Sequence, residues 1–396
     1  MKINLFFTFS RVCATTARTL LLFFIIYVQK NKNESSQLAL LLTIGLSLFQ
    51  LFNCDAHRGY YKQYFDTKKH SIKTANSYII YLNFFTGISI ISIIPLMVIL
   101  FFLFDSIIVI AFYPFVILFE KFFDEYQRFN LYIKHYIFWS YLALIVYLIP
   151  VLLTLFLIIF FDLNVVNCFV SCSFLVYFCL SLYLKKKIPW KIWKIWKMIS
   201  HSLRFYASRF GYLVINYLSS HILIVSRYMI YLTHESFFSL YVLIMNISNI
   251  VPTIIDLFYT AYRRKYFLTK KNEPFKILTD KKFFGLISIS IICSGAVISY
   301  LVIDNGHQIL DSIKISMIIC FIGLLYSISL ILYESVFWQR NIYARFTIEV
   351  VYYSFIIIIF SYSYFFKIEL LFILCLLSLA MLNRNAVTYY YIRGKK

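Results

Sequence analysis

Residues 136–161 read YIFWSYLALIVYLIPVLLTLFLIIFF, a run that contains no charged side chain. About 20 consecutive apolar residues suffice for a helix to cross the ~30 Å hydrocarbon core of a bilayer. The run is unbroken and does not alternate between apolar and polar residues, which excludes a strand of an outer-membrane β-barrel. This stretch therefore predicts a membrane-spanning helix.

The whole chain has the composition of a membrane protein. Of its 396 residues, 62% are apolar and 14% are charged, whereas soluble domains average about 45–50% and about 25%. The chain has 38 Lys and Arg against 17 Asp and Glu, a net charge of +21. In a soluble protein this excess would indicate a nucleic-acid partner, but here the apolar content decides the class first. We expect an all-α polytopic membrane protein with no nucleic-acid partner.

Further apolar runs predict about 12 transmembrane helices in two sets of six. Their approximate spans are 4–28, 37–57, 77–103, 106–122, 136–161 and 164–184, then 207–231, 236–260, 283–303, 315–336, 346–366 and 368–388. The fourth and last spans are the weakest. Lys121 interrupts the fourth and Asn383-Arg384-Asn385 interrupts the last.

The distribution of basic residues predicts the orientation. With this set of spans, 30 Lys and Arg fall on one side of the membrane and 4 on the other. Because cytosolic loops are enriched in Lys and Arg, both termini are expected in the cytosol. The outer connections are too short to hold an enzyme domain.

Three domains follow from this pattern. Residues 1–184 form an N-terminal six-helix lobe, 185–206 a basic amphipathic cytosolic linker, and 207–396 a C-terminal six-helix lobe. The linker repeats Trp, Lys and Ile every three residues between positions 190 and 197. Such a segment is typical of an interfacial helix that binds anionic membrane lipids, and the alternative is a basic loop without a fixed structure.

Charged residues inside the spans are the candidate site. An Arg near the centre of a membrane helix is unfavourable and normally faces a cavity or a partner. Arg11 and Arg18 lie two turns apart on one face of the first span, and Arg209 and Arg227 lie in the seventh. Asp256 in the eighth span is a candidate counter-ion or ion site. The functional interpretation is a cationic lumen for an anionic headgroup, and the alternative is a structural ion pair, such as Arg18 with Asp256.

Motifs of soluble enzymes are missing from the sequence. It contains no P-loop, so ATP hydrolysis by this chain does not drive transport, and it contains no GxGxxG, HExxH or GxSxG. The histidines are scattered, and we expect no metal and no cofactor. Glu349 follows Arg345 by four residues, a spacing typical of a pair that stabilises a helix end. We expect the chain not to be an enzyme.

Residues 205–267 carry the most specific resemblance to a known family. In this stretch Arg209, Ser226-Arg227-Tyr228, Ser239-Leu240-Tyr241 and Pro252 resemble the seventh and eighth helices of Wzx-type polysaccharide flippases. These flippases belong to the MOP superfamily, which also holds MATE drug exporters and lipid II flippases. The six-plus-six arrangement and the inward termini are similar over the whole chain.

The resemblance implies a MATE-like fold and a function. Two lobes would surround a cationic cavity and move a polyprenyl-diphosphate-linked oligosaccharide across the bacterial inner membrane by alternating access, for O-antigen or capsule synthesis. Arg11, Arg18 and Arg227 would contact the diphosphate and sugar, with Arg209 as a fourth substrate-binding residue. Polysaccharide assembly proteins would be partners, and an ion gradient would drive the cycle.

Three alternatives stay open. A MATE-type drug exporter moves cations and usually needs acids in its lobes, whereas the deep charges here are mostly Arg. A major-facilitator transporter also has twelve helices, but nine glycines are too few for its helix contacts. An O-antigen polymerase or another membrane-embedded glycan enzyme would need a catalytic side chain at the outer surface, where His234 and His307 are the candidate histidines.

Overall fold

The computed structural model describes residues 5–53, 92–132, 136–184, 214–215, 218, 221–248, 281–304, 309–338, 342–366 and 369–393. Almost all of these residues are helical, and there is no strand among them. The prediction of an all-α protein is confirmed for this part of the chain. The number of twelve helices stays a prediction, because long stretches lie outside the described residues.

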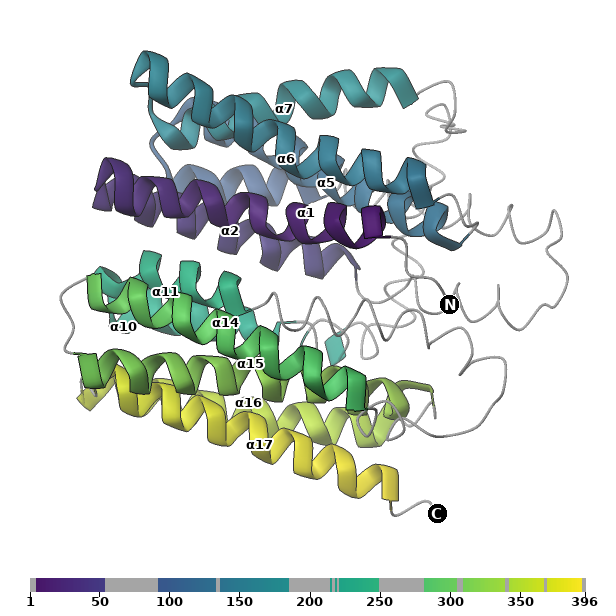
Figure 1. Cartoon of the computed structure of the whole chain (residues 1–396), viewed down its shortest axis with the longest axis vertical. Coiled ribbons are helices and arrows are strands. Elements are labelled where there is room, and N and C mark those ends of the chain that lie inside the picture. Colours follow the sequence, from purple (N-terminus) through teal and green to yellow (C-terminus); the bar gives the residue numbers. More distant parts are fainter. Residues whose placement is uncertain are drawn as a thin grey trace, which may run out of the picture. The chain divides into compact units, whose positions relative to one another are not determined.

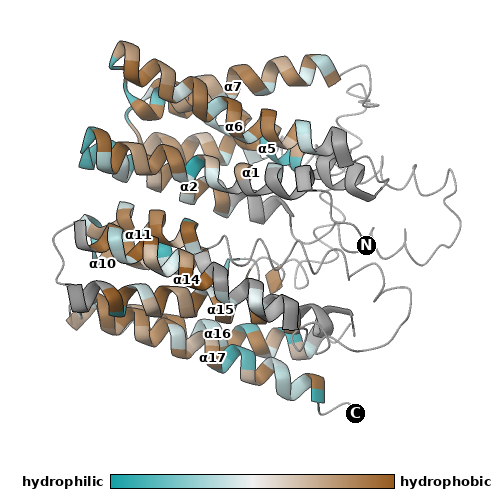
Figure 2. Ribbon diagram, in the orientation of Figure 1, coloured by the Kyte–Doolittle hydropathy of each residue, from teal (hydrophilic) through white to brown (hydrophobic). Residues whose placement is uncertain are grey.

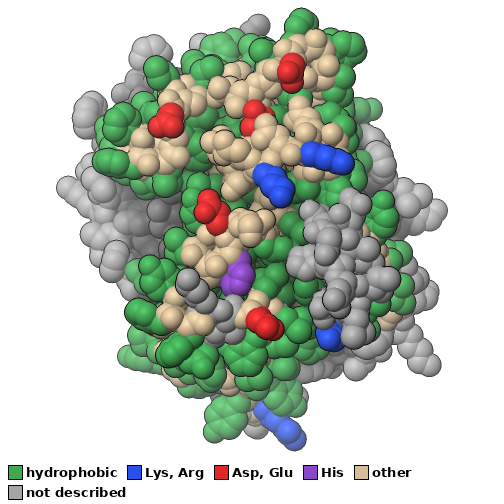
Figure 3. Space-filling view, turned by 90° about the vertical axis from the view of Figure 1, so that its left-hand side faces the viewer, with side chains coloured by type: hydrophobic (Ala, Val, Ile, Leu, Met, Phe, Trp, Pro, Cys, Tyr) green, Lys and Arg blue, Asp and Glu red, His purple; other side chains and the backbone are tan. Residues whose placement is uncertain are grey.

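Four of the described helices are long and apolar enough to cross a membrane, and the chain is therefore a membrane protein. They are Ser140–Phe161, Val165–Leu184, Tyr343–Phe366 and Leu370–Arg393. Hydrophobic residues dominate these helices in Figure 2. Large apolar side chains such as Phe102 and Ile107 are about four-fifths exposed, at 79% and 81%. Exposed apolar side chains of this size suit lipid better than water. On the face in Figure 3, separate charged side chains lie mostly among tan polar side chains and backbone, with hydrophobic side chains mainly toward the edges.

The chain divides into two compact units, each a bundle of helices (Figure 1). The N-terminal unit comprises Lys2–His221 and the C-terminal unit comprises Ile222–Lys396. The predicted linker 185–206 lies outside the described residues, and so does most of the predicted span 207–231 up to residue 221. Each unit is described separately below.

The N-terminal unit contains six named helical segments. They are α1 (Leu5–Phe24), the π-helical turn η1 (Ile25–Gln29), α2 (Lys32–Asn53), α5 (Ile107–Tyr132), α6 (Tyr136–Phe161) and α7 (Val165–Leu184). Helix α1 packs along α6, and α5 packs against both α6 and α7. These four helices surround one buried polar cluster, which is described in the next subsection.

Side-chain caps fix where the helices of this unit begin. Asn31 Oδ1 accepts a hydrogen bond from the Glu34 N–H at 3.2 Å and caps α2. Asn164 Oδ1 accepts one from the Asn167 N–H at 3.0 Å and caps α7. The Glu34 carboxylate reaches across from α2 and accepts the Val165 N–H at 3.2 Å. These groups satisfy N–H donors that a helix start leaves unpaired, so they hold α2 and α7 together at one end.

Six helices are described in the C-terminal unit. They are α10 (Ile222–Thr233), α11 (Glu235–Ser248), α14 (Lys281–Asp304), α15 (Ile309–Trp338), α16 (Ile342–Phe366) and α17 (Leu370–Arg393). Helix α15 packs along α17 and against α14, and α16 packs on α17. The single residue His234 separates α10 from α11, so these two helices form a tight hairpin.

The polar residues that weaken the fourth and last apolar runs do not end their helices. Helix α5 runs past Lys121 to Tyr132, and α17 runs through Asn383-Arg384-Asn385 to Arg393. In both helices the polar side chains find partners inside the bundle. Lys121 is fully buried and lies 3.6 Å from the Asp124 carboxylate. A buried polar residue with a partner does not end a helix.

Candidate functional site

The structure describes two of the five predicted site residues in full. Arg18 lies in α1 and Arg227 in α10, and both side chains are described. Arg11 lies in α1, but its side chain is outside the described part of the chain. Arg209 and Asp256 lie wholly outside the described residues. The predicted stripe of Arg11 and Arg18 therefore stays a prediction.

Arg18 sits among four helices of the N-terminal unit. Its guanidinium donates to Glu120 of α5 in an ion pair. It also lies over two aromatic rings, with its Cζ 5.9 Å from the ring centre of Tyr147 in α6 and 5.8 Å from that of Phe169 in α7. At these distances each ring contributes a favourable cation–π contact. The side chains of Arg18 and Glu120 remain 20% and 11% exposed, so this pair is not sealed.

Glu120 is the residue that the sequence analysis missed. The predicted alternative was that an acid such as Asp256 neutralises Arg18, whereas the described acid on Arg18 is Glu120. The sequence did contain a signal for Glu120, which is an acid next to Lys121 inside a predicted span. A charge there is unfavourable unless it has a partner. The sequence separation of 102 residues hid the pairing.

Arg227 of α10 is buried, and no acid among the described residues pairs with it. Its side chain is 2% exposed, and its Nη2 donates to Asn246 Oδ1 of α11 at 2.7 Å. Within the described part of the chain, Nε and Nη1 have no hydrogen-bond partner. A buried cation with one neutral acceptor is unfavourable by several kcal/mol relative to a satisfied one. This geometry therefore leaves room for a further acceptor, and an anion is the best one.

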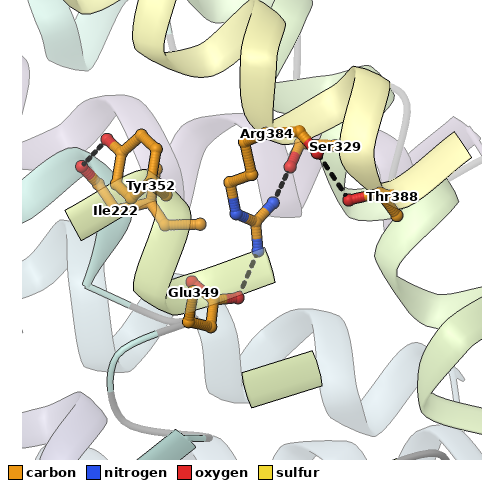
Figure 4. Close-up of polar contacts among 6 residues, drawn as sticks. All are labelled: Ile222, Ser329, Glu349, Tyr352, Arg384 and Thr388. Atoms are coloured by element: carbon orange, nitrogen blue, oxygen red, sulfur yellow. Dashed lines mark hydrogen bonds and ion pairs between the residues drawn. The ribbon is translucent and has the colours of Figure 1, made fainter. Parts of the chain in front are cut away.

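A second ion pair is fully enclosed in the C-terminal unit (Figure 4). Arg384 Nη2 of α17 donates to Glu349 Oε1 of α16 at 2.6 Å, and Arg384 Nη1 donates to the Ser329 hydroxyl of α15. The exposed fractions of the Arg384 and Glu349 side chains are 2% and 1%. The buried Glu349 carboxylate therefore joins α16 to α17, a contact that the sequence did not predict, and its expected pairing with Arg345 stays a prediction.

Neighbouring hydrogen bonds extend this enclosed cluster. Tyr352 donates its hydroxyl hydrogen to the Ile222 carbonyl at 3.2 Å, which ties α16 to the start of α10. Asn385 Nδ2 donates to the Leu325 carbonyl of α15 at 2.9 Å. Four helices therefore meet around polar groups that are buried in the C-terminal unit.

No metal centre is evident in the part of the chain that is described. There, no group of three or more His, Cys, Asp and Glu side chains could hold a metal ion. Of the two predicted candidate histidines for an outer catalytic group, His234 lies at the α10–α11 turn, with its Nδ1 3.0 Å from the Thr233 hydroxyl. His307 lies outside the described residues.

Comparison with known proteins finds no protein-family model, curated sequence or solved structure that matches this chain. The resemblance to polysaccharide flippases therefore stays a prediction, and the argument for function rests on the buried arginines.

Proposed function

We propose that the chain is a transporter that moves a lipid-linked diphosphate, a polyprenyl-diphosphate-linked oligosaccharide, across the bacterial inner membrane by alternating access of two six-helix lobes. The observation that carries the proposal is Arg227, whose buried guanidinium keeps unpartnered N–H donors in the described part of the chain. The planar guanidinium matches the oxygens of a phosphate, and it keeps its charge at every physiological pH. The oligosaccharide itself is inferred from the resemblance.

The surroundings of Arg18 and Arg384 support an anion over a cation as the substrate. Arg18 and Arg384 each face one carboxylate, so Glu120 and Glu349 are both neutralised by a guanidinium. Neither carboxylate is left as a site for a cationic drug. For this reason we favour an anion transporter over an exporter of the MATE drug-exporting type, and neither unit adds a second candidate function.

The test replaces Arg227 in cells and measures lipid-linked oligosaccharide on each leaflet. The gene is deleted in its host, and the deletion is complemented with wild type, Arg227→Met, Arg227→Lys or the control Arg393→Met. Arg393 lies exposed at the end of α17, so its replacement removes a charge without opening a buried site. We expect Arg227→Met to lower translocation about tenfold or more, because a charged hydrogen bond contributes about 1.5–3 kcal/mol. Arg227→Lys keeps part of the activity.

Stability separates loss of function from loss of fold. Methionine removes a poorly satisfied buried charge, so Arg227→Met should unfold at the same temperature as wild type or higher. Complete repeat units trapped on the cytosolic leaflet in the deletion strain support a flippase. Single repeat units that reach the outer leaflet without forming polymer would mean a polymerase-like enzyme instead. Wild-type translocation by Arg227→Met would remove the basis of the proposal.

A further inference from the structure

The Arg18–Glu120 pair differs from the other buried ion pair in how open it is. The Arg18 and Glu120 side chains are 20% and 11% exposed, against 2% and 1% for Arg384 and Glu349. Arg384 also donates to a serine hydroxyl, whereas aromatic rings flank Arg18. A ligand can therefore reach Arg18 by displacing one carboxylate. A ligand at Arg384 would have to break an enclosed network of hydrogen bonds.

We propose that Glu120 occupies the place of the anionic substrate on Arg18 in the empty transporter, and that Glu120 takes up one proton when the anion binds. This inference rests on the proposed function, since it assumes that Arg18 receives the diphosphate. It names Glu120 as a proton-binding residue and as the internal competitor of the substrate.

The physical reason is charge balance in a site with little water. A single guanidinium neutralises a single carboxylate, and Glu120 lies near the middle of α5, far from either end of the helix. If an anion bound Arg18 while Glu120 stayed ionised, two negative groups would share one positive group at low dielectric. The carboxyl oxygen therefore takes a proton from water as its hydrogen bond to Arg18 breaks. When the anion leaves, that proton returns to water and the ion pair forms again.

Other titratable groups around the pair do not replace Glu120 in this role. The described ones are Tyr147 of α6, Tyr177 of α7, and Tyr113, Lys121 and Asp124 of α5. Phenols stay neutral near pH 7. Lys121 and Asp124 lie 3.6 Å apart and neutralise each other. Glu120 is thus the described acid that pairs with Arg18, the cation that the anion would occupy.

Calorimetry on the purified full chain in detergent tests the inference. The probe is farnesyl-diphosphate-linked N-acetylglucosamine, because each of its two phosphates keeps a single acidic hydroxyl, which stays ionised near neutral pH. Titration in two buffers that differ in ionisation heat gives the affinity and the number of protons taken up. Because binding and proton uptake are linked, we expect one proton per anion, and an affinity that falls about tenfold for each unit rise in pH.

Variants assign the proton to its residue. Glu120→Gln is expected to bind the probe more tightly at pH 8 with no proton uptake, since the amide leaves Arg18 free of a competing charge. Glu120→Asp keeps a titratable group and should take up one proton. Glu34→Gln removes a carboxylate from the cap of α7 in the same unit and should bind the probe and take up one proton as wild type does.

The outcomes separate this inference from the proposed function. If wild type binds the probe without proton uptake, or if Glu120→Gln still takes up a proton, the role of Glu120 is wrong while the anion transporter stands. If wild type does not bind the probe, the proposed function fails and the inference fails with it. Should Glu120→Gln not fold, the proton count of wild type and of Glu120→Asp still decides.

Discussion

Removing the carboxylate of the enclosed ion pair should destabilise the C-terminal unit strongly. Glu349 accepts from Arg384 at 2.6 Å, and both side chains are almost completely buried. In Glu349→Leu the guanidinium would stay buried and would lose the carboxylate that neutralises it, while the Ser329 hydroxyl would remain as a neutral acceptor. An uncompensated buried charge lowers the free energy of unfolding by about 3–5 kcal/mol. At roughly 2–4 °C per kcal/mol, the unfolding midpoint should fall by about 6–20 °C.

The assay is thermal unfolding of the purified protein in detergent, followed by tryptophan fluorescence and by gel filtration after heating. The informative control is the double variant Glu349→Leu with Arg384→Met, which removes both charges and keeps the volume. An apolar replacement of a whole buried pair is often neutral or stabilising. The unfolding midpoint of this variant should therefore return most of the way to the wild-type value. An unchanged midpoint in Glu349→Leu, or a double variant less stable than the single one, would refute the reasoning.

Two further substitutions test the packing and capping of the N-terminal unit, and a third in α14 of the C-terminal unit serves as a control. Gly45→Ala should lower stability by about 1–3 kcal/mol, because a methyl there would overlap the Tyr113 hydroxyl, which donates to a carbonyl of α2 at 2.8 Å. Gly285→Ala, which meets nothing within 4 Å, should instead leave thermal stability equal or raise it by up to about 1 kcal/mol. Glu34→Gln should lower the unfolding midpoint by the equivalent of about 0.3–1 kcal/mol, since it removes a negative charge from the Val165 N–H at the start of α7. High salt should reduce the difference in unfolding midpoint between Glu34→Gln and wild type.

Helix positions followed from the sequence where the apolar runs are unbroken. The run 136–161 predicted α6 at the bounds the structure has, Tyr136–Phe161, and the run 164–184 predicted α7 within one residue. A hydrophobic run is a local property, so a single sequence reveals it. The capping residue Asn164 is also local, because it acts on a residue three positions later.

Partners of buried charges could not be read in the same way. Glu349 and Arg384 are 35 residues apart, and Arg18 and Glu120 are 102 apart. Each pair forms because two helices pack side by side. No local sequence pattern specifies which helices pack together. A charge within a span therefore predicts that a partner exists but not its identity. Arg384 is such a charge in the last predicted span, and its partner Glu349 lies on α16.

What each buried arginine contacts determines what it can do. Arg384 has its acid and its hydroxyl, so binding an anion there would break bonds in a closed site. Arg18 has an acid that a proton can release, which makes binding reversible and linked to pH. Arg227 has one amide oxygen and unpartnered donors within the described residues, so an anion there adds bonds and breaks none. We therefore expect an anion to form the most new hydrogen bonds at Arg227 and to exchange with the Glu120 carboxylate at Arg18. Arg384 does not bind the anion and instead holds helices of the C-terminal unit together.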